Sequence, residues 1–116
     1  MAAWVSQLRK GLVDLCILLA VAHDELYGYS LVQALRGVPN LEFTESTIYP
    51  ALARLIEDGL IRATERPSPV GPARRYLSLS NAGKRRLQQM RDHWSGLSQS
   101  VESLIHMHER GEANES

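Results

Sequence analysis

The sequence contains a single cysteine among its 116 residues, and this scarcity excludes several kinds of site. An internal disulfide needs two cysteines, and a thiolate metal centre needs more. Cys16 lies in the apolar segment Leu12–Ala22, where we expect a packed and unreactive thiol. His106 and His108 stand two residues apart, which places them on different faces of a helix and disfavours a metal pair. We therefore expect no metal and no cofactor.

Long hydrophobic runs and catalytic motifs are also missing. Leu12–Ala22 is the most apolar segment, yet it is shorter than the ~20 residues that a membrane-spanning helix needs. The first residues show no apolar region followed by a small-residue cleavage site, so we expect a cytoplasmic location and no membrane partner. The sequence shows no nucleophile–base pairing, phosphate-binding glycine loop or metal-ligand cluster, so we expect that the protein is not an enzyme.

The chain has no net charge, because 13 basic residues balance 13 acidic ones, but the two signs are separated along it. Only three acidic residues oppose the basic residues of the segment 54–86, which are Arg54, Arg62, Arg66, Arg74, Arg75, Lys84, Arg85 and Arg86. Acidic residues prevail after Asp92. A local basic stretch can contact phosphates while an acidic end cancels the total charge. Arginines that are merely solvated are the alternative interpretation.

Helical spacing of apolar residues predicts a first helix from about Trp4 to His23. The positions that recur every three or four residues are Leu8, Leu12, Leu15 and Leu19. Further apolar residues nearly encircle this helix, which indicates burial on more than one side. We expect a turn over residues 24–28 and a short helix around Ser30–Arg36, and the next residues break the pattern.

The third predicted helix has the clearest end signals. Thr44 is a suitable N-cap, and Phe43 before it can pack against Ile48. Pro50 removes a backbone hydrogen bond, so we expect a tightened or slightly bent first turn. Gly59 supplies a left-handed stop, which favours a Schellman arrangement at the end of the helix.

Two strands are predicted over Leu60–Arg66 and Arg74–Leu79, because apolar and polar residues alternate there. The proline-rich connector at residues 67–72 should form a protruding hairpin loop. Ser80 can cap a final long helix that runs to about Glu109, followed by a frayed tail.

The final helix carries a seam of apolar residues with a period near 3.5 residues, as in coiled coils. The seam consists of Leu87, Met90, Trp94, Leu97, Val101 and Leu104. We predict that it forms a dimer interface together with Leu8; ordinary packing within one chain is the alternative. The elements predict a mainly α fold with a small β-hairpin: a winged helix-turn-helix over residues 1–80, a dimerisation helix over 81–110 and a flexible tail over 111–116.

Several motifs in this order resemble the PadR family of transcriptional regulators. They are Tyr27-Gly28-Tyr29-Ser30-Leu31, Thr47-Ile48-Tyr49-Pro50-Ala51-Leu52, Asp58-Gly59-Leu60-Ile61, Arg74-Arg75-Tyr76 and Leu79-Ser80-Asn81-Ala82-Gly83. The third-helix motif, followed at the right distance by Arg-Arg-Tyr, carries most of the specificity. The match covers roughly residues 8–105 and is similar to the compact branch of the family, which has one C-terminal helix.

The resemblance implies a homodimer that binds double-stranded DNA through the third helix and the hairpin. The residues expected to contact DNA are Tyr29, Ser46, Thr47, Tyr49, Arg54, Arg66, Arg74 and Arg75. Hydroxyl groups of the third helix would bind phosphates, and the hairpin arginines would lie near the minor groove. The family tends to carry a basic or glycine-rich hairpin tip, and the proline-rich tip here disfavours deep insertion. Packing is the alternative role of Tyr49.

In family members that sense drugs, a tryptophan of the C-terminal helix stacks flat aromatic compounds at the dimer interface, and Trp94 falls at that position. The resemblance thus implies a small aromatic effector held by Trp94 and walled by Leu12 and Leu15. Packing on the seam is the alternative role of Trp94.

The implied function is that of a regulator, with repression the favoured action, which binds an inverted-repeat operator and is released by the effector. The alternative is a winged-helix adaptor that binds proteins and not DNA, which the zero net charge favours slightly.

Overall fold

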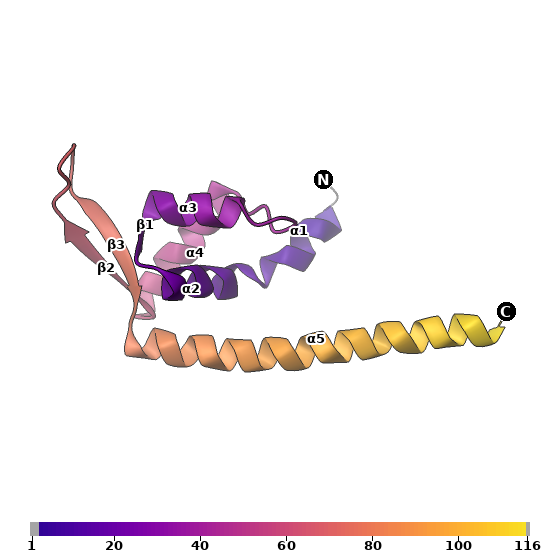
Figure 1. The fold of residues 1–116 in the computed structure, drawn as a ribbon. Helices are drawn as coiled ribbons and strands as arrows, with labels where there is room; N and C mark the ends of the chain where they lie inside the picture. Colours follow the sequence, from indigo (N-terminus) through magenta and orange to yellow (C-terminus); the bar gives the residue numbers. More distant parts are fainter. Residues whose placement is uncertain (1–2, 116) are drawn as a thin grey trace.

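The computed structural model describes residues 3–115, with side chains up to residue 111 (Figure 1). In chain order the elements are α1 (Ala3–Lys10), α2 (Val13–His23), β1 (Leu26–Tyr27), α3 (Gly28–Arg36), α4 (Glu45–Glu57), β2 (Ile61–Arg66), β3 (Arg74–Leu79) and α5 (Asn81–Glu115). Helices α2, α3 and α4 and the sheet form a head, and α5 runs beneath it as a long arm (Figure 1). The predicted fold class, a mainly α winged helix, is confirmed.

The prediction of one helix from Trp4 to His23 is wrong, because the chain breaks after α1. The N–H of Leu12 donates to the carbonyl of Arg9 at 2.9 Å, a tight turn in place of a continuing α-helix. Gly11 at the break is the poorest helix former of the segment. Five residues of α2 are buried and none of α1, so core packing fixes the direction of α2 only.

The sheet has three antiparallel strands in the order β1-β3-β2, one more than the predicted hairpin. The extra strand, β1, lies inside the predicted turn at residues 24–28, and it is too short to show an alternating pattern. It pairs with β3 in the register Leu26↔Leu77 and Tyr27↔Tyr76. Because α3 begins directly after Tyr27, this pairing fixes the start of α3 beside the wing, which we define as β2, β3 and their connecting loop.

Helix α2 occupies the centre of the core and contacts α3, α4, α5 and β3. The largest fully buried side chains are Ile17, Leu18, Leu31, Ile48, Ile61, Leu77 and Val32. Leu87 at the start of the predicted seam also belongs to this core, and Met90 packs against it. The first turns of the seam therefore pack within the protomer.

Thr44 holds the N-cap position before α4, as predicted, with an extended backbone of φ −88° and ψ 162°, but the predicted side-chain cap is absent. Its hydroxyl makes no capping bond to the helix and instead lies 2.9 Å from the hydroxyl of Ser46 and 3.2 Å from that of Thr47. The N–H groups of Thr47 and Ile48 both donate to the carbonyl of Thr44, so the first turn is tightened as the sequence predicts. Phe43 and Ile48 are both buried, in agreement with the predicted packing.

The end of α4 is the predicted Schellman motif. The N–H of Leu60 donates to the carbonyl of Leu55, and the N–H of Gly59 donates to that of Ile56, both at 3.0 Å. Gly59 has φ +75°, a conformation that glycine adopts at little cost. The chain thus turns sharply from α4 into β2.

Helix α5 starts directly against this turn. Ser80 caps it as predicted: the N–H of Gly83 donates to the Ser80 Oγ at 3.0 Å. Ser80 in turn donates from its N–H to the carbonyl of Leu60 at 3.1 Å and from its Oγ to that of Gly59 at 2.5 Å. A Cβ on Gly83 would lie 2.0 Å from the Leu60 oxygen, so only glycine fits there. This α4–α5 junction joins the two helices through backbone contacts.

The far end of α5 differs from the prediction. The helix continues to Glu115, past the expected end near residue 110, so the backbone of the predicted tail is helical over 111–115. Ser116 lies outside the described residues. Gly111, the first residue of the expected tail, costs only about 1 kcal/mol in a helix and does not end it.

No helix within residues 3–115 combines the length and the apolar character that crossing a membrane requires. Among the side chains described, those of residues 3–111, no group of three or more histidine, cysteine or acidic residues could hold a metal ion. Burial raises the pKa of the Cys16 thiol, which keeps it in the less reactive protonated form.

Candidate nucleic-acid interface

All eight side chains expected to contact DNA are exposed: Tyr29, Ser46, Thr47, Tyr49, Arg54, Arg66, Arg74 and Arg75. They come from the start of α3, from α4 and from the wing. Some of them share one surface, and others are engaged with partners elsewhere in the chain.

A tyrosine cluster joins three elements of this surface. The ring of Tyr27 stacks against that of Tyr29 with centroids 6.5 Å apart, and it meets Tyr76 edge-on at 5.9 Å. Helix α4 borders the same place, because a Cβ on Gly28 would lie 3.9 Å from the Tyr49 ring. The pairing of β1 with β3 therefore brings α3, α4 and the wing together around Tyr27.

Arg74 belongs to this cluster. Its guanidinium carbon lies 4.6 Å from the centroid of the Tyr27 ring, within the range of a cation–π interaction. Such a contact orients the side chain and leaves its charge available to an anion. Arg74 and the exposed Tyr29 thus both contact the ring of Tyr27.

Arg66 has a different environment, although it lies opposite Arg74 in the register of the wing. It forms an ion pair with Glu25 and lies 4.8 Å from the centroid of the Tyr76 ring. The acid neutralises much of its charge. Arg66 therefore ties β2 to the segment between α2 and β1, and it is less available to a phosphate than Arg74 is.

Arg75 lies on the other face of the sheet, because successive side chains of a strand alternate. In the register of the wing it stands opposite Glu65. The three arginines of the wing therefore do not form one basic group. Arg75 lies on one face of the sheet and Arg66 and Arg74 on the other, where Arg66 pairs with a carboxylate and Arg74 with a tyrosine ring.

Arg54 is also engaged within the chain. Its Nη2 donates to the Oδ1 of Asp14 at 2.7 Å, an ion pair between α4 and α2. Both side chains keep part of their surface exposed. Sequence reasoning missed this partner, because Asp14 lies forty residues earlier and no local pattern connects the two.

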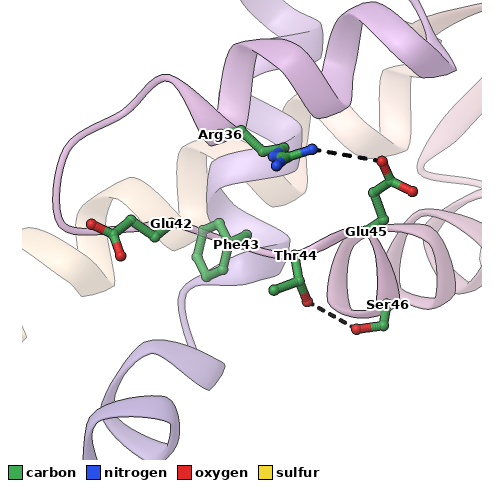
Figure 2. A pocket seen from close by; sticks show the side chains of 6 residues that line it. All are labelled: Arg36, Glu42, Phe43, Thr44, Glu45 and Ser46. Carbon is green, nitrogen blue, oxygen red and sulfur yellow. Dashed lines mark hydrogen bonds and ion pairs between the residues drawn. The ribbon is translucent and has the colours of Figure 1, made fainter. Parts of the chain in front are cut away.

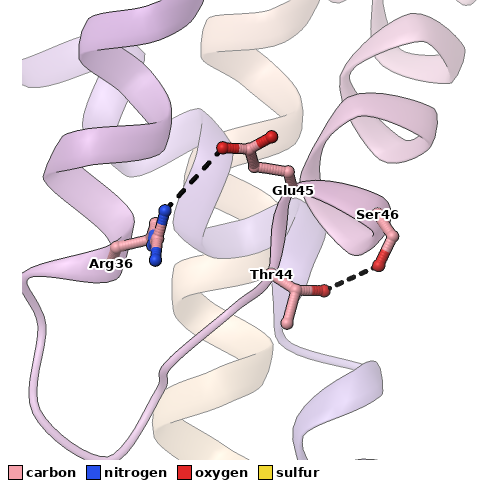
Figure 3. Close-up of polar contacts among 4 residues, drawn as sticks. All are labelled: Arg36, Thr44, Glu45 and Ser46. Atoms are coloured by element: carbon pink, nitrogen blue, oxygen red, sulfur yellow. Dashed lines mark hydrogen bonds and ion pairs between the residues drawn. The ribbon is translucent and has the colours of Figure 1, made fainter.

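A second missed feature lies at the turn between α3 and α4. The Nη1 of Arg36, at the end of α3, lies 3.7 Å from the Oε1 of Glu45, the first residue of α4 (Figure 3). Both border an open pocket of about 520 Å³ whose lining residues are Arg36, Glu42, Phe43, Thr44, Glu45 and Ser46 (Figure 2). A carboxylate at the start of a helix is favoured by the helix dipole, which is the only role that the sequence position of Glu45 indicates.

The predicted ligand and dimer residues separate into two groups. Leu15, Leu87 and the partly buried Leu12 and Met90 pack in the protomer's own core. By contrast, Leu8, Trp94, Leu97, Val101 and Leu104 are 47–73% exposed. Leu15 is therefore not free to wall a ligand site, and the free part of the seam begins at Trp94.

Comparison with known proteins places these features in a family. The profile of the Transcriptional regulator PadR-like family matches residues 17–89, which span α2 to the start of α5. A Streptococcus transcriptional regulator is 42% identical, with a TM-score of 0.75 over 84% of this chain and 96% of that one. A PadR-like transcriptional regulator from Bacillus cereus is 33% identical, with a TM-score of 0.77 over 86% and 97% of the two chains. A PadR-like transcription factor from Bacteroides fragilis is 32% identical, with a TM-score of 0.71 over 85% and 95%.

Proposed function

We infer that this chain, which belongs to the PadR-like family of transcriptional regulators, binds double-stranded DNA through α4 and the wing. Members of this family are regulators and not enzymes, so the chain regulates transcription and catalyses no reaction. One observation carries the choice of surface: Tyr29, Tyr49 and Arg74 gather around Tyr27, where three elements meet.

In the proposed complex the first turn of α4 enters the major groove, as the recognition helix of a helix-turn-helix does. Ser46 and Thr47 are small and exposed there, which permits a close approach to the DNA. Arg74 and the hydroxyl of Tyr29 contact the phosphate backbone, which fixes the register of the complex. Arg66 and Arg54 take a lesser part, because each already pairs with a carboxylate.

The proposed complex contains two copies of the chain. Helix α5 extends well beyond the head (Figure 1). Its residues Trp94, Leu97, Val101 and Leu104 are exposed. Apolar residues arranged along one helix favour burial against a second copy around a two-fold axis. Leu8 on α1, which is 73% exposed, is the proposed contribution of the N-terminal helix.

A two-fold dimer places two recognition helices in successive major grooves. The operator should therefore be an inverted repeat whose half-sites lie ~10 base pairs apart or a multiple of this. Repression follows where such a site overlaps a promoter.

A small aromatic effector is part of the proposal. Trp94 offers an indole face on the free part of the seam, and its mate across the two-fold axis can leave a slot for a flat ring. Leu12 at the break between α1 and α2 is the remaining candidate for a wall from the head, since Leu15 is buried. Effector binding would tilt α5 and lower the affinity for DNA.

The test is fluorescence anisotropy of the protein with its own upstream DNA, titrated with salt. A double variant, Arg74→Ala with Arg75→Ala, is compared with Arg91→Ala, which removes an exposed arginine of α5. The proposal expects salt-sensitive binding that the double variant loses and the control retains.

A confirmed dimer that fails to bind this DNA and random duplexes at low salt would contradict the proposal. That result would favour an adaptor that binds a protein partner. Thr47→Glu separates the two functions further, because it should abolish DNA binding and leave the contact of an adaptor largely intact.

A further inference from the structure

The first turn of α4 presents one charged side chain among neutral ones. Glu45, Ser46 and Thr47 are exposed at the end of the helix that we propose to enter the major groove, and Glu45 is the first residue of that helix. A carboxylate on a DNA-binding surface lowers the affinity unless it makes a specific contact, because it repels the phosphates that surround the groove.

Arg36 reduces this repulsion. Its guanidinium lies 3.7 Å from one carboxylate oxygen of Glu45 and comes from the neighbouring helix α3, as Figure 3 shows. The side chains of the pair remain 58% and 60% exposed, so the pairing does not bury the carboxylate. Within the described residues the second oxygen, Oε2, has no partner, and the pocket beside it is open (Figure 2).

The neighbouring hydroxyl groups form hydrogen bonds with one another. The Oγ1 of Thr44 lies 2.9 Å from the Oγ of Ser46 and 3.2 Å from the Oγ1 of Thr47. Because these three groups satisfy part of their hydrogen-bonding capacity locally, they position the turn more than they read bases. Glu45 is then the strongest free acceptor of the first turn.

The chemistry of a carboxylate restricts what it can recognise. It only accepts hydrogen bonds, and phosphate oxygens offer none. In the major groove the base donors are the N4 amino group of cytosine and the N6 amino group of adenine, and adenine N7 beside N6 is an acceptor that repels a carboxylate. Cytosine is therefore the base that fits.

We propose that Glu45 is a specificity-determining residue, which accepts a hydrogen bond from the N4 amino group of a cytosine in each half-site while Arg36 holds and neutralises it. This inference rests on the proposed DNA-binding function. It assigns the sequence readout to a residue outside the set expected from the sequence, and it predicts a C·G pair at one symmetry-related position of the operator.

The experiment is selection of duplexes from a randomised pool by the full-length protein, followed by sequencing. Wild type is compared with Glu45→Gln and with Glu42→Gln, a matched control that changes another exposed carboxylate of the same pocket. We expect wild type to enrich C over other bases at one position per half-site by about tenfold or more. In Glu45→Gln the preference should move to A, because an amide pairs with adenine N6 and N7. The control should keep the wild-type preference.

The outcomes separate this inference from the proposed function. If wild type and Glu45→Gln select the same sequences, or if the variant binds all sequences equally more weakly, Glu45 has only a structural role and the inference is wrong while DNA binding stands. If wild type selects no sequence and shows no salt-sensitive binding, the proposed function fails as well. Circular dichroism melting of both variants confirms that they are folded.

Discussion

Arg54 in α4 and Asp14 in α2 form a hydrogen-bonded ion pair of 2.7 Å, which joins the two helices and occupies the guanidinium within the chain. The same pattern recurs elsewhere in the head, where Arg36 pairs with Glu45 and Arg66 with Glu25. The zero net charge of the chain thus has a structural counterpart, because several of its arginines are neutralised by carboxylates of their own chain.

Asp14→Asn should free Arg54 to reach a phosphate. We expect tighter DNA binding and a salt dependence steeper by about one logarithmic unit for each phosphate gained, because counterion release follows the number of contacts. The loss of the exposed pair should cost about 0.2–1 kcal/mol of folding free energy. Anisotropy titrations at several salt concentrations measure the slope, and Asp24→Asn is the control at another exposed carboxylate of this region. An unchanged slope would mean that Arg54 serves only to brace α4 on α2.

The two arginines that lie opposite each other in the wing should respond differently to alanine. Arg74→Ala should lower the salt slope by about one unit per protomer, since its guanidinium stacks on Tyr27 and has its charge available. Arg66→Ala should leave the slope nearly unchanged and lower the melting temperature, because Arg66 pairs with Glu25 and packs on Tyr76. Equal loss of affinity in both variants would show that the ion pair with Glu25 opens on DNA.

Two glycines of α5 should differ sharply in their tolerance of alanine. At Gly83 an added Cβ would meet the Leu60 carbonyl oxygen at 2.0 Å, so we expect destabilisation of about 1–3 kcal/mol, typical of overpacking. At Gly96 nothing lies within 4 Å of an added Cβ, and alanine should stabilise the helix by about 0.5–1 kcal/mol. Thermal melts at one fixed protein concentration compare them, and similar shifts in both would disprove the close contact.

The free part of the seam should decide the oligomeric state. A double substitution, Leu97→Glu with Val101→Glu, places charge on the exposed apolar side of α5 and should convert the proposed dimer to a monomer of 13.0 kDa. Gln99→Glu adds charge to a polar position of the same helix and should leave the dimer intact. Light scattering after size-exclusion chromatography gives the mass. A mass that stays at twice 13.0 kDa in the double variant would contradict a dimer built on this seam.

Features with local causes could be predicted from the sequence. Gly59 marks the end of α4 because the Schellman motif needs only a glycine and its neighbours, and Ser80 marks the start of α5 for a similar reason. The strands of the wing follow from alternation. The exposure of all eight expected DNA contacts also agrees with the sequence pattern.

Features set by tertiary contacts could not be predicted. Strand β1 exists because Tyr27 pairs with Tyr76, some fifty residues later, and two residues leave no periodic signal. The ion pair of Arg54 depends on how α4 packs against α2. The apolar period of α5 is continuous through Leu87 and Trp94, so it does not reveal that the first residue is buried in the head and the second is exposed.

The close contact between Leu60 and Gly83 makes the α4–α5 junction the pivot point of the long helix α5. The 35 residues of α5 span about 50 Å, and the pivot is the carbonyl of Leu60, between the end of α4 and the start of the wing. Because this junction consists of backbone groups in close contact, it has little room to absorb a tilt of α5. In the proposed dimer, a change of a few degrees in the angle between the two α5 helices would therefore alter the distance between the two α4 helices. An operator with fixed half-site spacing would then bind with lower affinity.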